Sequence, residues 1–445
     1  MTNITDSFIA YLMERGNGDI PEKVYEKAEA CFIDYLGVAY AGAKECKAAV
    51  TGLADGNLGS SSVLGSDIKT NAGYAAFING FHAHALELDD GHRFGMIHLG
   101  AVIISAVLAA VQEKTVSYKQ FLKGIIMGYE AAVRLAIAMQ PGHKKKGFHT
   151  TGTCGTVGAA VGIAFAMEYS DLQLKTAIAA ATTGAAGLLE IQEDASTLKP
   201  YNVAHAAMTG VTAAYTGRSG LLHGPDDILG GNRGMLYLMS DTVSVNKLTE
   251  IEDYYEIERI YVKPYAACRH CHPAMEAAIE LSNEYAILFD NIRNIKVYTY
   301  SLAIKGHDHT EIKGIGSAKL SMPYSVAAAY ILKSGNLEVF SSENIARQDI
   351  LELTGRVDIL ERQEFSEQAS QKRIAEVELY TKDGSVVKKR VDYAKGDPEN
   401  PMSRQEVLDK FRKLMSLCEE TYRTDSILDI LGRNEIDTQE LFEML

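Results

Sequence analysis

The sequence lacks several features that would assign a protein class at once. It contains six cysteines among 445 residues, at positions 31, 46, 154, 268, 271 and 418. They are too few and too scattered for a disulfide framework, so we expect reduced thiols. No apolar run is long enough to cross a bilayer, and the first residues show no signal-peptide pattern. These absences predict a cytoplasmic protein that does not enter a membrane.

An excess of positive charge is also missing. The chain carries 44 lysines and arginines against 58 aspartates and glutamates, a formal charge of −14. This balance argues against nucleic acid or an anionic membrane as the main partner. The composition is otherwise that of an ordinary globular protein, and the length exceeds what one hydrophobic core usually serves. We therefore expect two domains.

Helical patterns dominate the first 245 residues or so. The stretch 19–42 begins with Asp19 as a candidate N-cap, has Pro21 in its first turn, and ends on a glycine. Such an order predicts a helix that stops at this glycine. Later segments at 155–169, 176–190 and 202–217 are rich in alanine and glycine. Small residues on several faces let helices pack closely, which predicts a tight bundle.

The sequence pattern changes from helical to strand-like near residue 250. The stretches 255–265, 292–304 and 373–393 are β-branched, aromatic and alternating, and Asp383–Gly384 is a hairpin turn signal. Helical stretches at 272–285 and 325–335 lie between them. The predicted fold is mainly α with a smaller α+β domain: an all-helical main domain, 1–250 and 397–445, made discontinuous by C-terminal helices that return to it, and an α+β domain, 251–396.

One short run, HALELDDGHRFGMIH at 84–98, holds three histidines and three carboxylates. It suits either a metal site or metal-free acid–base chemistry. His84 with Asp89, or His92 with His98, can ligate a metal, but the HExxH spacing is missing. CRHCH at 268–272 has one CxxC without a second ligand pair. We therefore expect no metal and, without a glycine-rich nucleotide motif, no cofactor; a metal hydrolase remains an alternative.

Basic residues recur where a loop leads into an apolar helix. His149 follows three lysines and precedes a glycine- and threonine-rich helix start, a place that attracts carboxylates and should lower the pKa of this histidine. Lys199, Lys263 with Arg269, and Lys319 occupy similar positions. Taken alone, each of these basic residues could equally be an ordinary polar group of the surface or the core. Their repetition favours one shared pocket for an anion.

These motifs together resemble the MmgE/PrpD family. HALELDDGHRFGMIH resembles the family's H-x-L-D-x-D-D-x-H…H signature, and GFHTTGTCGTVGAA, LKPYNVAHAAMTG, VKPYAACRHCHPAMEA, AKLSMPYSVAAA and GDPENPMS follow in family order. The chain departs from the pattern at Glu87, where aspartate is usual, at Gly91, where threonine is frequent, and at Ala204, where glycine is typical. The resemblance covers essentially the whole chain.

The resemblance implies a fold and a site. It implies a helical main domain, an α+β lid domain, a homodimer, and a metal-free active site between the domains. The catalytic positions of the cis-aconitate decarboxylase branch match His98, His149, Lys199, His272 and Tyr324 in this sequence. The family also contains 2-methylcitrate dehydratases and iminodisuccinate epimerases.

All these reactions add or remove a proton on carbon, a task suited to histidine. We expect His149, as base, and His98 to form the acid–base pair. Helper groups that orient or relay protons are Glu87, Asp90 and Tyr324, with His272 as a further catalytic residue. The expected substrate-binding residues are Lys199, Lys263, Arg269 and Lys319, which would hold carboxylates, together with Asp90 and His92.

The favoured function is a 2-methylcitrate dehydratase-like hydro-lyase that acts on a small polycarboxylate. An epimerase of an iminodisuccinate-like amino dicarboxylate and a cis-aconitate-type decarboxylase need the same residues and remain alternatives. A non-catalytic carboxylate-binding relative is the alternative outside enzymes.

Overall fold

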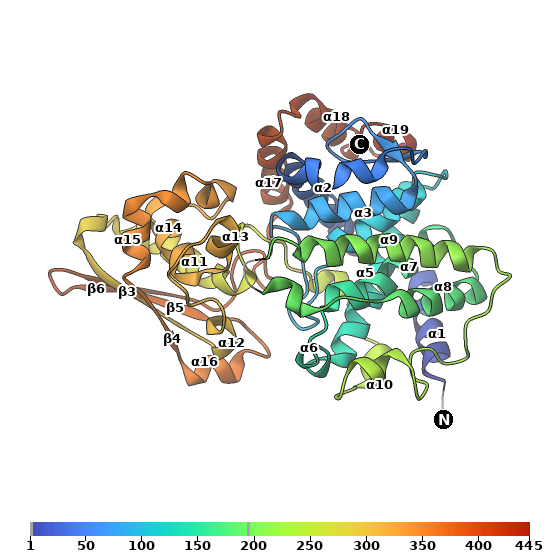
Figure 1. Cartoon of the computed structure of the whole chain (residues 1–445), viewed down its shortest axis with the longest axis horizontal. Coiled ribbons are helices and arrows are strands. Elements are labelled where there is room, and N and C mark those ends of the chain that lie inside the picture. Colours follow the sequence, from blue (N-terminus) through green and yellow to red (C-terminus); the bar gives the residue numbers. More distant parts are fainter. Residues whose placement is uncertain (1–2, 194–195) are drawn as a thin grey trace. The chain divides into compact units, whose positions relative to one another are not determined.

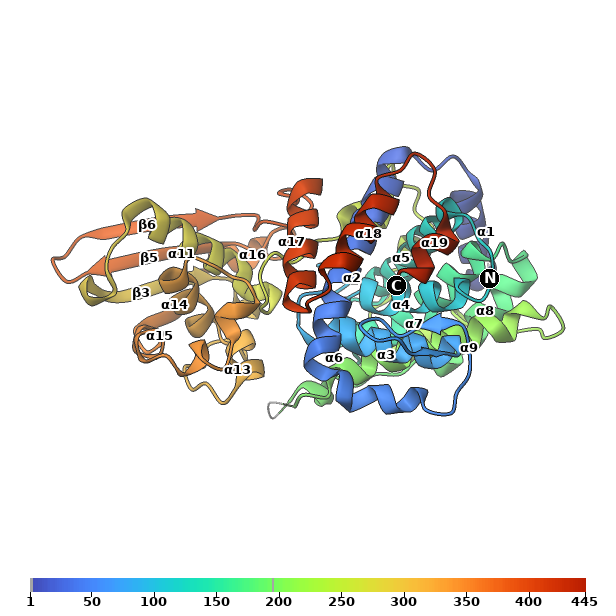
Figure 2. The ribbon, with the colours of Figure 1, turned by 90° about the horizontal axis from the view of Figure 1, so that it is seen from above.

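The computed structural model describes residues 3–193 and 196–445, which form two compact units (Figures 1 and 2). The helical unit comprises Met1–Tyr261 and Ser403–Leu445, and the α+β unit comprises Val262–Met402. The sequence places these boundaries at 250/251 and 396/397. The fold class is as predicted, mainly α with a smaller α+β part.

Helices make up almost all regular structure of the helical unit. Its elements are α1 (Ile4–Asn17), α2 (Glu22–Val50), β1 (Ser61–Ser62), β2 (Lys69–Thr70), α3 (Ala72–Ala85), α4 (Gly100–Val111), α5 (Tyr118–Met139), α6 (Gly142–Lys145), α7 (Thr150–Ala166), α8 (Asp171–Gly184), α9 (Lys199–Arg218), α10 (Met235–Met239), α17 (Arg404–Leu417), α18 (Thr421–Leu431) and α19 (Thr438–Glu443). Among its described residues, no helix is both long and apolar enough to cross a membrane.

The core of this unit is built around α4 and α7, in which every residue is buried. α7 packs against α4, α5 and α9, and α9 also packs against α3 and α8. Glycines allow these close approaches: a Cβ on Gly158 of α7 would lie 2.7 Å from the Gly128 carbonyl oxygen of α5. The tight bundle predicted from small residues is therefore present.

Helix α2 does not stop at Gly42, where the sequence predicts its end. It continues to Val50. A Cβ at position 42 would lie 1.9 Å from the His82 carbonyl oxygen, so only glycine lets α3 pass here. This glycine serves helix packing rather than a left-handed C-cap.

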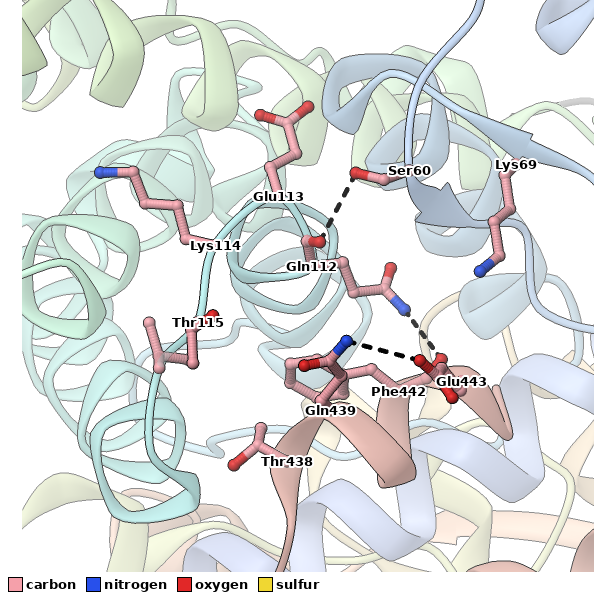
Figure 3. Close-up of a pocket in the computed structure, with 11 residues that line it drawn as sticks. Ser60, Lys69, Gln112, Glu113, Lys114, Thr115, Thr438, Gln439, Phe442 and Glu443 are labelled. Carbon is pink, nitrogen blue, oxygen red and sulfur yellow. Dashed lines mark hydrogen bonds between the residues drawn. The ribbon is translucent and has the colours of Figure 1, made fainter.

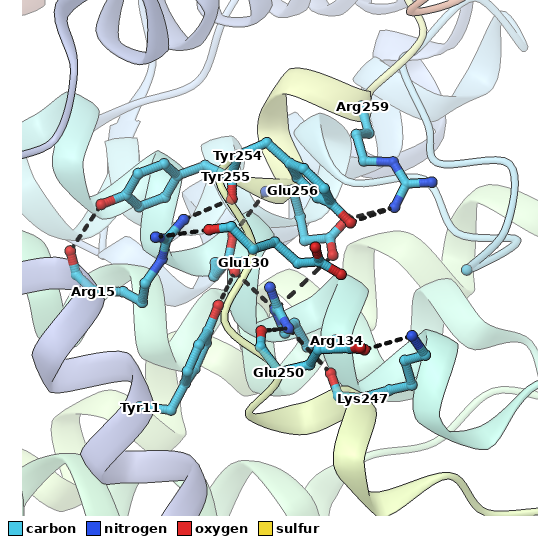
Figure 4. A network of polar contacts seen from close by, with 12 residues as sticks. Tyr11, Arg15, Glu130, Arg134, Lys247, Glu250, Tyr254, Tyr255, Glu256 and Arg259 are labelled. Atoms are coloured by element: carbon cyan, nitrogen blue, oxygen red, sulfur yellow. Dashed lines mark hydrogen bonds and ion pairs between the residues drawn. The ribbon is translucent and has the colours of Figure 1, made fainter.

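The segment 255–265, predicted as extended, is also different. Glu256–Arg259 form a 3₁₀ helix that belongs to the helical unit. A buried charged network binds it there (Figure 4): the Glu256 backbone N–H donates to Glu130 of α5 at 2.7 Å, and Arg134 and Tyr11 donate to the same carboxylate at 2.8 and 2.6 Å. Burial raises the pKa of Glu256 to about 7. Tertiary hydrogen bonds override the β-like sequence pattern.

The α+β unit holds a four-stranded sheet in the order β4–β3–β5–β6. β3 is parallel to β4 and antiparallel to β5, and β5 and β6 form the hairpin predicted at Asp383–Gly384. Helices α11 and α14 pack against each other and against strands of the sheet. Its elements are α11 (His272–Tyr285), β3 (Ile292–Thr299), α12 (Ser301–Ile304), α13 (Ile315–Leu320), α14 (Met322–Leu332), α15 (Gln348–Thr354), β4 (Val357–Glu361), α16 (Gln363–Gln368), β5 (Ala375–Thr381) and β6 (Val386–Val391).

The glycine contact between α5 and α7 predicts a clear stability effect. We expect Gly158→Ala to destabilise the helical unit by about 1–3 kcal/mol, because the added methyl also meets the Ala132 Cβ at 2.6 Å. Urea unfolding followed by helical circular dichroism measures the loss. Gly52→Ala is the matched control, since the nearest atom to its Cβ is 3.9 Å away. Equal midpoints for the two variants would contradict the packing argument.

Candidate active site

Two adjacent aspartates after α3 organise the candidate site. Asp90 is buried, and its Oδ1 accepts the N–H groups of Leu99 and Gly100 at 3.3 and 2.8 Å. Its Oδ2 accepts the Tyr129 hydroxyl at 2.7 Å. Burial raises the pKa of Asp90 to about 6, although these hydrogen bonds act in the opposite direction. This carboxylate therefore joins the loop 86–99, the start of α4 and the middle of α5.

Asp89 joins two histidines. Its Oδ2 lies 2.8 Å from His84 Nδ1 and 3.2 Å from His98 Nδ1. Burial acts to raise the pKa of Asp89, but the two histidines outweigh it and hold this pKa well below its usual range. Burial also lowers the pKa of His84. The result is an ionised carboxylate shared by two imidazoles.

His98 is the accessible member of this cluster. Its side chain is 16% exposed, against 0% for His84 and 4% for Asp89. The His98 Nδ1 also lies 2.8 Å from the Asp90 carbonyl oxygen, and its backbone N–H donates to Thr151 Oγ1 at 3.1 Å. The rings of His84 and His98 meet edge to face at 4.9 Å. His84 and Asp89 thus contact a histidine whose side chain stays partly exposed.

His149 lies at the N-cap position of α7 and is buried. The Asn202 side-chain amide donates to its Nδ1 at 3.1 Å and to the Leu188 carbonyl oxygen at 3.2 Å. Burial lowers the pKa of His149 well below its usual value, and Lys199, His84 and His98 lower it further. The predicted direction is confirmed. Its causes differ, because the sequence pointed to the three lysines that precede the helix.

Lys199 begins α9 and forms an ion pair with Glu87. Their side chains are 19% and 18% exposed, so both are accessible from solvent. Glu87 has a φ of 55°, in the left-handed region that non-glycine residues seldom adopt. The Glu87 Oε1 also lies 3.8 Å from His84 Nε2. This pair extends the histidine cluster towards the first turn of α9.

His92 lies near a different carboxylate, that of Glu256. It is buried, its Nδ1 accepts the Gly95 N–H at 3.0 Å, and its Nε2 lies 3.6 Å from Glu256. The backbones of His92 and Ile97 exchange two hydrogen bonds. These contacts close the loop that precedes His98, which suits a supporting role more than substrate contact.

In the α+β unit, Arg269 and His272 contact each other. Arg269 donates to His272 Nδ1 at 2.6 Å and pairs with Asp397 at 2.6 Å, while His272 Nε2 donates to the Ala267 carbonyl oxygen at 3.1 Å. His272 is fully buried. The turn before α11 therefore holds a fixed imidazole beside a paired guanidinium.

The other predicted residues of this unit are buried as well. The Tyr324 hydroxyl donates to the Val339 carbonyl oxygen at 2.8 Å, and its side chain is fully buried. Lys263 is 1% exposed and Lys319 is 6% exposed. Their predicted roles towards substrate, and that of His272, stay predictions.

Three residues of the helical unit offer a set of metal ligands. One ligand atom each from His84, Asp89 and His98 lies within 4.8 Å of the others. The Asp89 oxygen, however, is 2.8 and 3.2 Å from the two nitrogens. Ligands about 2.1 Å from a tetrahedral ion lie about 3.4 Å apart. The observed spacing fits a hydrogen-bonded triad better.

A separate pocket of about 400 Å³ lies on the helical unit (Figure 3). Its lining includes Lys69, Lys114, Glu113 and Glu443, but none of the residues predicted for the active site. It holds no histidine or cysteine among the described residues that line it. This pocket therefore offers no group for acid–base chemistry by histidine or cysteine, and the histidine–carboxylate cluster is the stronger candidate.

Sequence reasoning missed four members of the cluster. His84 and Asp89 lie in the quoted motif but were considered only as metal ligands. Asn202 stands three residues after Lys199 on α9, a spacing that puts both on one helix face. Tyr129 lies in the middle of an apolar helix, where one sequence gives no signal for it.

These features describe a mainly helical protein of two units whose helical unit holds a site suited to acid–base chemistry. Comparison with protein families gives its relationship. Residues 6–247 match the MmgE/PrpD N-terminal domain and residues 265–430 match the MmgE/PrpD C-terminal domain. The chain belongs to the MmgE/PrpD family.

Curated relatives match along nearly the whole chain. The cis-aconitate decarboxylase of Aspergillus terreus is 24% identical, over 100% of this chain and 96% of the relative. The human cis-aconitate decarboxylase is 24% identical, over 98% and 92%. A cis-aconitate decarboxylase-like protein of Aspergillus oryzae is 26% identical, over 96% and 93%.

The Tyr129–Asp90 contact predicts a pH-dependent stability change. Because the folded pKa of Asp90, about 6, lies above the unfolded value of about 4, its ionisation lowers stability as pH rises through this window. The tyrosine hydroxyl offsets part of this loss. We expect Tyr129→Phe to cost about 1.5–3 kcal/mol at pH 8 and clearly less at pH 5, where Asp90 is mostly protonated.

Tyr35→Phe is the control for this experiment. Its buried hydroxyl bonds the neutral Ser105 hydroxyl at 2.8 Å, so its loss should not vary between pH 5 and pH 8. Urea unfolding by circular dichroism gives both values. A Tyr129→Phe loss that is the same at both pH values would contradict the stated ionisation of Asp90.

Proposed function

We propose that this protein is a lyase that acts on a small di- or tricarboxylic acid without a metal, by moving a proton at the carbon next to a carboxylate. The main support for the proposal is a single observation. Two histidines of the helical unit, His98 and His149, have opposite hydrogen-bond environments at Nδ1 and can therefore act in complementary roles.

His98 is the proposed base. Both partners of its Nδ1 in the described part of the chain are acceptors, the Asp90 carbonyl oxygen and the ionised Asp89, so Nδ1 carries the hydrogen. In the neutral ring, Nε2 then has a free electron pair that can take a proton. The Asp89 carboxylate stabilises the imidazolium that forms, as the aspartate does in a catalytic triad.

His149 is the proposed hydrogen-bond donor. The Leu188 carbonyl oxygen fixes the orientation of the Asn202 amide, so its NH₂ group must face His149 Nδ1. The lowered pKa keeps the ring neutral, and its hydrogen lies on Nε2. A neutral imidazole of this tautomer donates to developing negative charge but does not accept a proton there. The sequence-based assignment of His149 as base is thus replaced by His98 in our proposal.

Lys199 is the proposed anchor for a substrate carboxylate. It is partly exposed beside Glu87, and it lies close enough to lower the pKa of His149. A carboxylate bound there would bring the acidic carbon towards both histidines. Lys263, Arg269, Lys319, His272 and Tyr324 keep their predicted roles, and a homodimer is our expectation for assembly.

The candidate reactions differ in the proton transfers that they need. A hydro-lyase needs a base for the carbon proton and an acid for the departing hydroxide, whereas a decarboxylase needs one proton donor after carbon dioxide leaves. In our proposal His98 serves as both in turn, because it takes the carbon proton and returns it to the departing hydroxide as water, while His149 stabilises the negative charge by hydrogen bonding. This division of roles favours the hydro-lyase, of the 2-methylcitrate dehydratase type. The relatives named cis-aconitate decarboxylases favour decarboxylation as the second candidate.

A substrate screen tests the function directly. Purified protein is incubated in deuterated water with 2-methylcitrate, cis-aconitate and iminodisuccinate, with and without a chelator, and followed by NMR and carbon dioxide release. We expect turnover of a free acid that the chelator leaves unchanged, and none of its neutral ester. Loss of turnover on chelation that zinc restores would instead favour the metal alternative.

Substitution of the two histidines tests their assigned roles. We expect His98→Gln to lower kcat and proton exchange by about 10²–10⁴. His149→Gln should lower kcat by only about tenfold, because an amide N–H can still donate, whereas His149→Leu should lose about 10²–10³. KM should change far less, since Lys199 remains. Equal losses for His149→Gln and His149→Leu would assign proton transfer to His149 and overturn our proposal.

A further inference from the structure

Cys268 and Cys271 lie on one tight turn of the α+β unit. The Cys271 backbone N–H donates to the Cys268 carbonyl oxygen at 2.9 Å, just before α11 begins. Such a turn brings its first and fourth Cα atoms within about 7 Å, and a disulfide spans about 4.4–6.8 Å between Cα atoms. The backbone thus permits a bond between the two sulfurs.

Cys268 also has a proton acceptor at its side. Its Sγ lies 3.7 Å from His307 Nε2, while His307 Nδ1 donates to the Leu320 carbonyl oxygen at 2.8 Å. The carbonyl holds the hydrogen of the ring on Nδ1, so Nε2 is the nitrogen that can take the thiol proton. A thiol, an imidazole and a group that orients the imidazole form the arrangement that activates cysteine nucleophiles.

For the other partly exposed thiols, the described residues provide no such acceptor. Cys46 donates to the Gly42 carbonyl oxygen at 2.9 Å and Cys418 to the Leu414 carbonyl oxygen at 3.4 Å. A carbonyl oxygen cannot take up the proton, and burial raises the pKa of each of these thiols to about 11. They therefore serve as internal controls for reactivity.

We propose that Cys268 and Cys271 form a peroxide-reactive thiol pair, in which Cys268 is attacked first and Cys271 resolves it. His307 takes the Cys268 proton, the thiolate attacks one peroxide oxygen, the O–O bond breaks, and the departing hydroxide receives the proton as water. The Cys271 sulfur then displaces hydroxide from the Cys268 sulfenic acid. In balance, two thiols and one hydrogen peroxide give one disulfide and two waters.

The experiment uses the full-length protein, hydrogen peroxide and mass spectrometry. Trypsin cleaves after Arg259, Arg269 and Arg293, so the proposed disulfide joins two separate peptides, 260–269 and 270–293. We expect this linked pair to appear under low peroxide and to vanish on reduction. Cys268 should be oxidised at least about tenfold faster than Cys46 and Cys418. In Cys271→Ser, a sulfenic-acid probe should label Cys268.

His307→Asn tests the acceptor, because asparagine can accept a hydrogen bond but takes no proton. We expect oxidation of Cys268 to slow by about tenfold, with Cys46 unchanged. Should this variant fail to fold, the pH dependence of iodoacetamide labelling in the unaltered chain decides: the Cys268 midpoint should lie below that of Cys46. Oxidation of Cys268 no faster than that of Cys46, or no linked peptide, would overturn the proposal.

Discussion

The candidate site depends on a pair of buried carboxylates held side by side in the chain. Asp90 fixes the backbone, because its two oxygens bond the start of α4 and the hydroxyl of Tyr129 in α5. Asp89 fixes side chains, because one oxygen meets two imidazoles. Placing two acids in an apolar core is unfavourable unless each finds donors. The donors to Asp89 include His98, which the proposed chemistry needs in a fixed position, and the donors to Asp90 hold the backbone that follows His98.

Much of the architecture could be predicted from the sequence because its signals are local. Helical periodicity, the hairpin turn at Asp383–Gly384 and the small-residue helices all appear in the structure. Gly42 shows where local signals fail: glycine is required there by the carbonyl oxygen of His82, forty positions away, and not by the end of a helix. The prediction of an extended segment at 255–265 is wrong for a similar reason, because a carboxylate on α5 accepts a hydrogen bond from its backbone.

The sequence predicts the types of residue in the candidate site but not the hydrogen bonds between them. The motif 84–98 and the histidine at 149 identify the groups, yet nothing in the chain order reveals that Asn202 bonds His149 or that Tyr129 bonds Asp90. These hydrogen-bond partners determine which ring nitrogen of a histidine carries the hydrogen, and so what the histidine can do chemically. Two histidines with the same ring differ because one Nδ1 faces acceptors and the other faces a donor. A tautomer is a property of tertiary contacts, which a sequence does not display.

The Glu87–Lys199 pair adds a constraint on what the site can bind. Glu87 already neutralises Lys199, so in the proposed binding mode a substrate carboxylate has to compete with a carboxylate of the protein. The pair is partly exposed, so water screens it and the exchange costs little. The left-handed backbone at Glu87 holds this side chain at the cluster, although glutamate seldom adopts that conformation. A neutral ligand cannot replace the Glu87 carboxylate as the partner of the lysine, whereas an anion can. With Lys199 as the proposed anchor, the pair itself therefore favours anionic substrates, whichever reaction follows.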